Sequence, residues 1–90
     1  MRAAKRDANQ PQIVDALRAA GVTVIEMGHV GGGVPDLFCV RRATGLCRWL
    51  EVKMPKGRLT KAQIDWHQKV PVWVVHSVAE ALAAMEVEVA

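Results

Sequence analysis

The first quarter of the chain carries apolar residues at helical spacing. Between Ile13 and Ala20 they fall at i, i+1, i+4 and i+7, with charged residues off this stripe, which predicts a helix over residues 7–20. The signals expected at its ends are a capping side chain, a proline in the first turn and a terminal glycine, namely Asp7 or Asn9, Pro11 and Gly21.

Runs that are rich in β-branched residues predict four strands. They cover residues 22–27, 37–42, 46–53 and 72–76. A short turn at residues 43–45 joins the second and third strands into a hairpin. The fourth run is nearly continuous in apolar residues, which is typical of a central strand that is buried on both faces.

Two further helices follow from capping signals. The segment from Thr60 to Gln63 matches a capping box and opens a helix that Pro71 ends. Ser77 caps a last helix that runs to about Met85. The predicted order is α-β-β-β-α-β-α, a single α/β domain with a mixed sheet of about four strands flanked by helices.

The composition fits one folded domain over residues 1–90, because 51% of the residues are hydrophobic and 23% are charged. A chain this short has a thin core, which favours an oligomer. No apolar stretch approaches the roughly 20 residues of a spanning helix, and the first ten residues lack the apolar region of a signal peptide, so we expect a cytoplasmic protein. Cys39 and Cys47 have neither the number nor the spacing for a disulfide scaffold or a zinc site, and we interpret them as small apolar side chains in or near strands.

The charge is distributed unevenly along the chain. Residues 1–69 hold all 12 Lys and Arg and six of the nine acids, and so carry a net charge of +6, whereas residues 70–90 carry −3. This distribution is compatible with a polyanionic partner and equally with an ordinary solvated surface.

Three charged residues are expected to meet at the open end of the predicted hairpin. Asp36 begins the second strand, and Glu51 and Lys53 end the third on one face, because residues i and i+2 of a strand point the same way. Two carboxylates at one place require a cation between them, and Mg²⁺ is commonly held by one or two carboxylates. An ammonium beside the metal can stabilise charge that develops on a phosphate. The alternative is a turn aspartate beside a solvated ion pair.

The motifs Val34-Pro35-Asp36-Leu37, Leu50-Glu51-Val52-Lys53 and Leu59-Thr60-x-x-Gln63, in this element order, resemble the PD-(D/E)xK nuclease superfamily. More narrowly, the chain is similar to small stand-alone VRR-NUC domains. The resemblance implies a restriction-endonuclease-like core and an endodeoxyribonuclease that depends on Mg²⁺ or Mn²⁺. It also implies action on branched DNA such as Holliday junctions, a homodimer, and a bacterial or phage-infected cell.

The resemblance also implies a role for each matching residue. Asp36 and Glu51 would be metal ligands together with the backbone carbonyl of Val52, and Lys53 would be the catalytic lysine. Gln63 would approach the site from its helix, although a capping box would compete for the same side chain.

The first helix departs from the family pattern, because Gln10 stands where related domains carry a glutamate that reaches the metal. Gln10 would offer a neutral oxygen, and Asp7, one turn earlier, is the alternative ligand. The family reading therefore has a rival, a catalytically weak or inactive DNA-binding module of the same fold, or a structural subunit of a larger nuclease assembly.

The basic residues that follow the third strand, and the glycines that precede Asp36, complete the expected site. Lys56, Arg58 and Lys61 are expected to contact the DNA backbone. The glycine loop at residues 28–33 lacks the residues of a phosphate-cradling P-loop and is interpreted as a hinge that admits DNA to Asp36.

Overall fold

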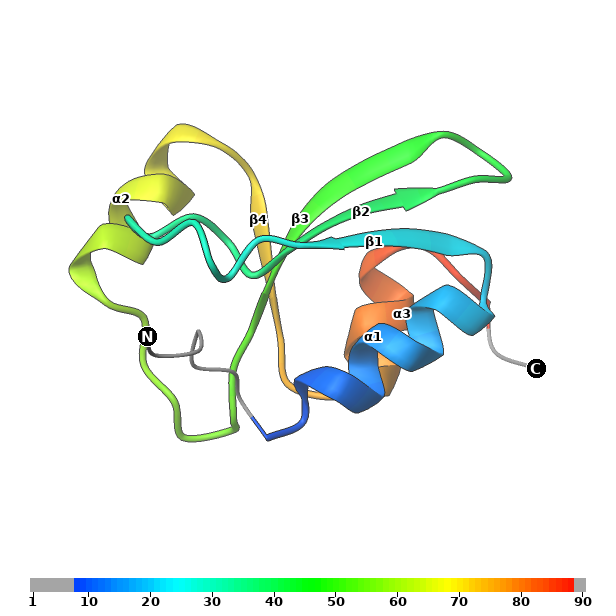
Figure 1. Ribbon diagram of the computed structural model, residues 1–90, viewed down its shortest axis with the longest axis horizontal. Coiled ribbons are helices and arrows are strands. Elements are labelled where there is room, and N and C mark those ends of the chain that lie inside the picture. The colour runs from blue at the N-terminus through cyan, green and yellow to red at the C-terminus, as the bar shows by residue number, and fades with distance from the viewer. Residues whose placement is uncertain (1–7, 89–90) are drawn as a thin grey trace.

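The computed structural model describes residues 8–88 and confirms the predicted order of elements (Figure 1). The elements are α1 (Gln10–Ala19), β1 (Val22–Glu26), β2 (Leu37–Arg41), β3 (Leu46–Val52), α2 (Lys61–Lys69), β4 (Val72–Val75) and α3 (Val78–Ala84). Their ends differ from the predicted ends by a few residues, and Asp7 lies outside the described residues.

The four strands form one mixed sheet in the order β1-β2-β3-β4. The pairs β1–β2 and β2–β3 are antiparallel, and β4 pairs with β3 in parallel. The prediction that residues 72–76 form a central strand is therefore wrong, since β4 lies at an edge. Val72, Trp73 and Val74 are only partly buried, and Val75 alone in this strand is fully buried. The run is apolar because α3 packs against it, and an unbroken apolar run does not by itself distinguish an edge from a centre.

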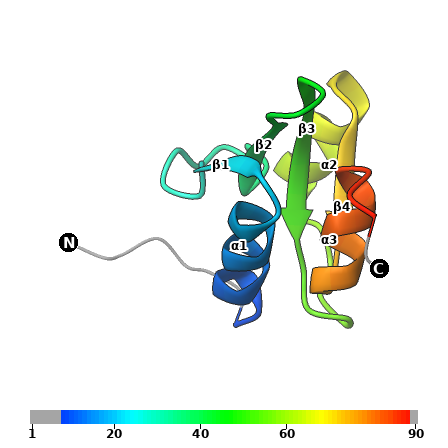
Figure 2. The same cartoon turned by 90° about the vertical axis from the view of Figure 1, so that its right-hand side faces the viewer.

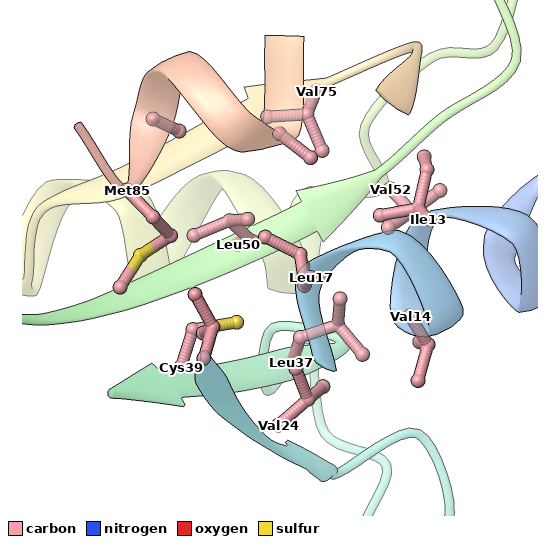
Figure 3. Packing of buried hydrophobic residues seen from close by; sticks show 13 residues of the cluster. Ile13, Val14, Leu17, Val24, Leu37, Cys39, Leu50, Val52, Val75 and Met85 are labelled. Carbon is pink, nitrogen blue, oxygen red and sulfur yellow. The ribbon is translucent and has the colours of Figure 1, made fainter. Parts of the chain in front are cut away.

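The hydrophobic core lies between one face of the sheet and the pair of helices α1 and α3. These helices contact each other and lie side by side beneath the strands in Figure 1, and α2 lies behind the strands in the turned view of Figure 2. Figure 3 shows how Ile13 and Leu17 of α1 meet Leu37, Leu50 and other buried strand residues. Because side chains alternate along a strand, Phe38 of β2 and both Trp49 and Glu51 of β3 lie on the opposite face of the sheet.

The helix α2 stands apart from this core, because none of its residues is buried. It contacts the other face of the sheet through Trp66, whose ring centroid lies 6.0 Å from that of Trp49. The predicted capping box is confirmed, since the Thr60 side chain accepts a hydrogen bond from the backbone N–H of Gln63 and the Gln63 side chain accepts one from that of Thr60. Local capping, and not core burial, thus defines this helix.

The ends of the other helices show one error in the prediction. Gly21 follows α1 with φ of 85°, as a terminal glycine should, and Ser77 caps α3 by accepting from the N–H of Glu80. Asn9 stands at the N-cap of α1 but makes no capping hydrogen bond, because its side-chain amide donates to the backbone carbonyl of His76 at 2.9 Å. Asn9 therefore ties the start of α1 to the end of β4.

Burial separates the two cysteines, although both lie in strands and are free thiols. Cys39 is part of the core, and burial raises its pKa to about 12, so the thiol stays protonated. Cys47 is exposed at the start of β3. Within residues 8–88, no helix has the length and apolar character needed to cross a membrane.

Candidate active site

Asp36 lies beside the end of β3, where the hairpin pairing brings it. Leu37 pairs with Leu50, so one further step of the antiparallel register sets Asp36 opposite Glu51. The Asp36 carboxylate oxygen Oδ2 accepts a hydrogen bond from the backbone N–H of Val52 at 2.9 Å. The two carboxylates that were expected to meet thus come from neighbouring positions on adjacent strands.

The backbone carbonyl of Val52 faces the same side as Asp36. The N–H of Lys53 donates to the carbonyl of Val75, 3.0 Å away on the β4 side. Successive residues of a strand direct their backbone groups to alternate neighbours, so the N–H and the carbonyl of Val52 both face the β2 side. The Val52 carbonyl therefore faces the same end of the sheet as Asp36.

Glu51 is the buried carboxylate of the pair, with only 1% of its surface exposed. It stands in β3 between Leu50 and Val52, which are fully buried on the opposite face. Its oxygen Oε2 accepts a hydrogen bond from Nε2 of Gln63 at 3.2 Å. Carboxylates are buried to this degree only where hydrogen bonds or cations compensate the lost hydration.

The Gln63 side chain makes the capping hydrogen bond and also contacts Glu51, the two contacts that the sequence set against each other. Its oxygen Oε1 accepts from the backbone N–H of Thr60 at 2.8 Å, and its nitrogen Nε2 donates to Glu51. The two contacts do not compete, because they use opposite ends of one amide group. Gln63 therefore links the first turn of α2 to the carboxylate on β3.

The amide nitrogen Nε2 of Gln10 donates a hydrogen bond to Oε1 of Glu26 at 3.3 Å. Gln10 begins α1 and is 3% exposed, and Glu26 ends β1 opposite Leu37. Glu26 is the carboxylate that sequence reasoning missed. Its position at the end of a strand whose next residue, Met27, pairs with Asp36 was the available signal.

The cationic residues lie between the end of β3 and the start of α2. Lys53 follows Glu51 by two positions, so strand alternation directs it to the same face, and it is partly buried. Lys56, Arg58 and Lys61 are exposed between the end of β3 and the first turn of α2. These three side chains give this segment an exposed positive charge.

The glycine loop approaches α2 closely at Gly33. Gly31, Gly32 and Gly33 all have φ between 68° and 82°, the left-handed region that favours glycine. A Cβ atom on Gly33 would overlap the backbone carbonyl of Ala62, whereas one on Gly31 or Gly32 would meet nothing within 4 Å. Figure 1 shows this loop running beside α2. The loop thus lies directly against the first turn of the helix that carries Gln63.

The donor set fits a hard divalent cation. Asp36, Glu51 and the Val52 carbonyl offer oxygen atoms alone, and Mg²⁺ commonly takes one or two carboxylates from a protein and completes its shell with water and substrate. Within the described residues no three His, Cys, Asp or Glu side chains are grouped closely enough to hold a metal. A closed structural zinc site, which needs four protein ligands, is therefore not formed by residues 8–88.

An acidic pair at the end of a hairpin, a lysine two residues on and a helix that supplies glutamine define the PD-(D/E)xK type of nuclease domain. The VRR-NUC domain family matches residues 2–78, and the chain belongs to this family. No curated protein and no solved structure matches the chain. Family membership implies a nuclease, a hydrolase whose substrate is nucleic acid.

Proposed function

We propose that the protein is a DNA endonuclease that depends on Mg²⁺ or Mn²⁺ and hydrolyses phosphodiester bonds at the end of the sheet where β2 begins and β3 ends. The observation that carries the proposal is the hydrogen bond from the Val52 N–H to Asp36, which fixes Asp36 beside Glu51. Family membership supports the reaction class. The exposed cations after β3 support a polyanionic substrate.

Asp36, Glu51 and the Val52 carbonyl would hold the metal ion. When bound, the ion lowers the pKa of a coordinated water and polarises a phosphoryl oxygen. Gln63 keeps Glu51 oriented by donating to it, and Asp36 is held by Val52. Lys53 supplies a positive charge on the Glu51 face, where it stabilises the negative charge that grows on the phosphate.

The DNA backbone would run along the segment that holds Lys56, Arg58 and Lys61, since these exposed cations follow directly after Lys53. We propose a homodimer that acts on branched DNA, including four-way junctions. Two observations support a dimer. The core is confined to one face of the sheet, and Ile25 and Ile64 are 49% and 44% exposed.

A second candidate function is a DNA-binding module that cleaves weakly or not at all. The observation that favours it is Gln10, a neutral amide at the start of α1 whose nitrogen donates to Glu26. A site with two carboxylates holds a divalent cation less tightly than one with three, so catalysis would depend on the substrate phosphate to complete the shell.

Metal-dependent cleavage of a plasmid and of a four-way junction separates the two functions. We expect the protein to cleave with Mn²⁺ or Mg²⁺ and to stop when the metal is chelated. Lys53→Ala should lower the cleavage rate by about 100-fold or more, with the fold and DNA affinity retained. Lys69→Ala, which removes a lysine exposed at the end of α2, is the matched control and should cleave normally. Binding without cleavage at millimolar Mn²⁺ would establish the module instead, and a Lys53→Ala variant with the original rate would remove Lys53 from the mechanism.

A further inference from the structure

The first turn of α2 is joined to the candidate metal ligand Glu51 by an unbroken chain of hydrogen bonds. The Thr60 hydroxyl accepts from the N–H of Gln63 at 3.2 Å, and the Thr60 N–H donates to Oε1 of Gln63 at 2.8 Å. Nε2 of Gln63 then donates to Oε2 of Glu51 at 3.2 Å. Thr60 itself touches neither Glu51 nor Asp36 in this chain of contacts.

The capping box determines which end of the Gln63 amide faces Glu51. The backbone N–H of Thr60 is a donor, so the atom of Gln63 that meets it must be the oxygen. The amide NH₂ is then directed at the Glu51 carboxylate, which can only accept. Without the cap, rotation of the amide would place an oxygen against a buried carboxylate for part of the time, and that contact is repulsive.

The hydrophobic core contributes little to this orientation, because no residue of α2 is fully buried and Trp66 is only partly buried against Trp49. The backbone of Gly33 approaches this first turn closely, since a Cβ on Gly33 would overlap the backbone carbonyl of Ala62. The position of Gln63 thus depends on a cap from one side and on a glycine from the other. Neither belongs to the acidic pair.

We propose that Thr60 is a positioning residue for metal binding, which acts through Gln63 on Glu51, and that Gly33 allows the close approach on which this arrangement depends. The inference rests on the proposed function, since it assumes that Glu51 is a metal ligand. Residues that orient a ligand from outside the coordination shell typically change metal affinity about 10- to 100-fold when they are removed.

The test is Mn²⁺ affinity measured by calorimetry on the full chain without DNA, with thermal unfolding followed in parallel by circular dichroism. Gln63→Ala should raise the Kd for Mn²⁺ about tenfold or more, and Thr60→Val about three- to tenfold. Thr60→Ser keeps the capping hydroxyl and should restore the original Kd. The double variant Thr60→Val/Gln63→Ala should bind no more weakly than Gln63→Ala alone, because both changes break one path.

Gly33→Ala and Gly32→Ala form a matched pair that does not depend on Thr60. Both substitutions place a side chain at positive φ, but only the one at Gly33 collides with Ala62. Gly33→Ala should therefore raise the Kd for Mn²⁺ about three- to tenfold, and Gly32→Ala should leave it unchanged while it lowers the unfolding midpoint. If Thr60→Val does not fold, this pair still tests whether the placement of the first turn of α2 affects metal binding.

The outcomes separate this inference from the proposed function. If the unsubstituted protein binds Mn²⁺ and cleaves DNA, but Thr60→Val lowers only the unfolding midpoint and leaves the Kd unchanged, Thr60 is a helix cap and nothing more. Equal Kd values for the Gly33 and Gly32 variants would overturn the role of Gly33. An unsubstituted protein that neither binds Mn²⁺ nor cleaves DNA would overturn the proposed function, and this inference with it.

Discussion

Two substitutions at Asp36 separate its structural role from its proposed catalytic role. The Asp36 carboxylate accepts from the N–H of Val52, a residue with 0% exposure. Asp36→Asn keeps an oxygen that can accept this hydrogen bond but removes the charge. Asp36→Ala removes the acceptor as well and leaves a buried N–H without a partner.

The expected loss of stability follows from that single contact. A buried donor that loses its acceptor costs about 1–3 kcal/mol of unfolding free energy, and 1 kcal/mol shifts the unfolding midpoint of a domain of this size by about 4–8 °C. Asp36→Ala should therefore lower the midpoint by roughly 4–24 °C. Asp36→Asn exchanges a hydrogen bond to a charged acceptor for one to a neutral acceptor, which lowers stability by about 0.5–1.5 kcal/mol.

Cleavage should not follow stability in these variants. Both substitutions remove one of the two proposed ligand carboxylates, so both should abolish Mn²⁺-dependent cleavage at a temperature where circular dichroism shows a folded protein. Asp15→Ala, which removes an exposed carboxylate of α1, is the control for a change of net charge. The reasoning is refuted if Asp36→Ala unfolds at the original midpoint, and the ligand role is refuted if Asp36→Asn cleaves at the original rate.

Three further predictions concern other parts of the chain. Replacing Lys56 and Arg58 together by Gln should weaken DNA binding about equally for all sequences and flatten its salt dependence, as fluorescence anisotropy across a salt series would show; an unchanged salt slope would place the DNA elsewhere. Gln10→Glu puts a second carboxylate against Glu26, so it should destabilise the metal-free protein by about 1–3 kcal/mol. It should also make Mn²⁺ raise the unfolding midpoint more than in the unsubstituted chain, and no change in that metal response would exclude Gln10 from the site. The side-chain hydrogen bond with His76, and after it the bond from the His76 backbone N–H, lower the pKa of Glu80 below its ordinary 4.5. The Glu80 carboxylate therefore adds stability above pH 4.5 that is lost as the pH falls through the lowered pKa. Glu80→Gln should show a smaller drop of the unfolding midpoint over that acid range, and an unchanged dependence of the midpoint on pH would contradict this prediction.

Local signals were sufficient to predict the elements of this fold. Helical spacing in α1, the capping box at Thr60 and the Ser77 cap each depend on residues close together in sequence, and each predicted the right element. The strand order depends on which strands pair with each other, and the hydropathy pattern does not determine that pairing directly. That is why β4 was expected at the centre and lies at the edge.

The contacts of the candidate site also differ in whether local sequence signals could predict them. Asp36 and Glu51 could be placed together in advance, because a hairpin fixes which residues lie opposite each other. The contact between Gln10 and Glu26 joins a helix to a strand 16 positions away in sequence, and no turn fixes that geometry. The sequence also did not predict that one Gln63 side chain makes both the capping hydrogen bond and the contact with Glu51, since this depends on the position of α2, a helix with no fully buried residue, relative to β3.

The position of Glu51 is itself an argument for a role in binding a cation. The residue is 1% exposed and lies in β3, between two paired strands, with a fully buried residue on either side in sequence. Moving a carboxylate from water to such a place costs several kcal/mol before its hydrogen bonds are counted, and an apolar side chain of similar volume is often neutral or stabilising in its place. The structural reasons that explain Leu50 and Val52 therefore do not explain Glu51. An apolar residue cannot supply a charged oxygen at the end of β3, directly across from Asp36, and this supports our proposal that Glu51 is a ligand of a divalent cation.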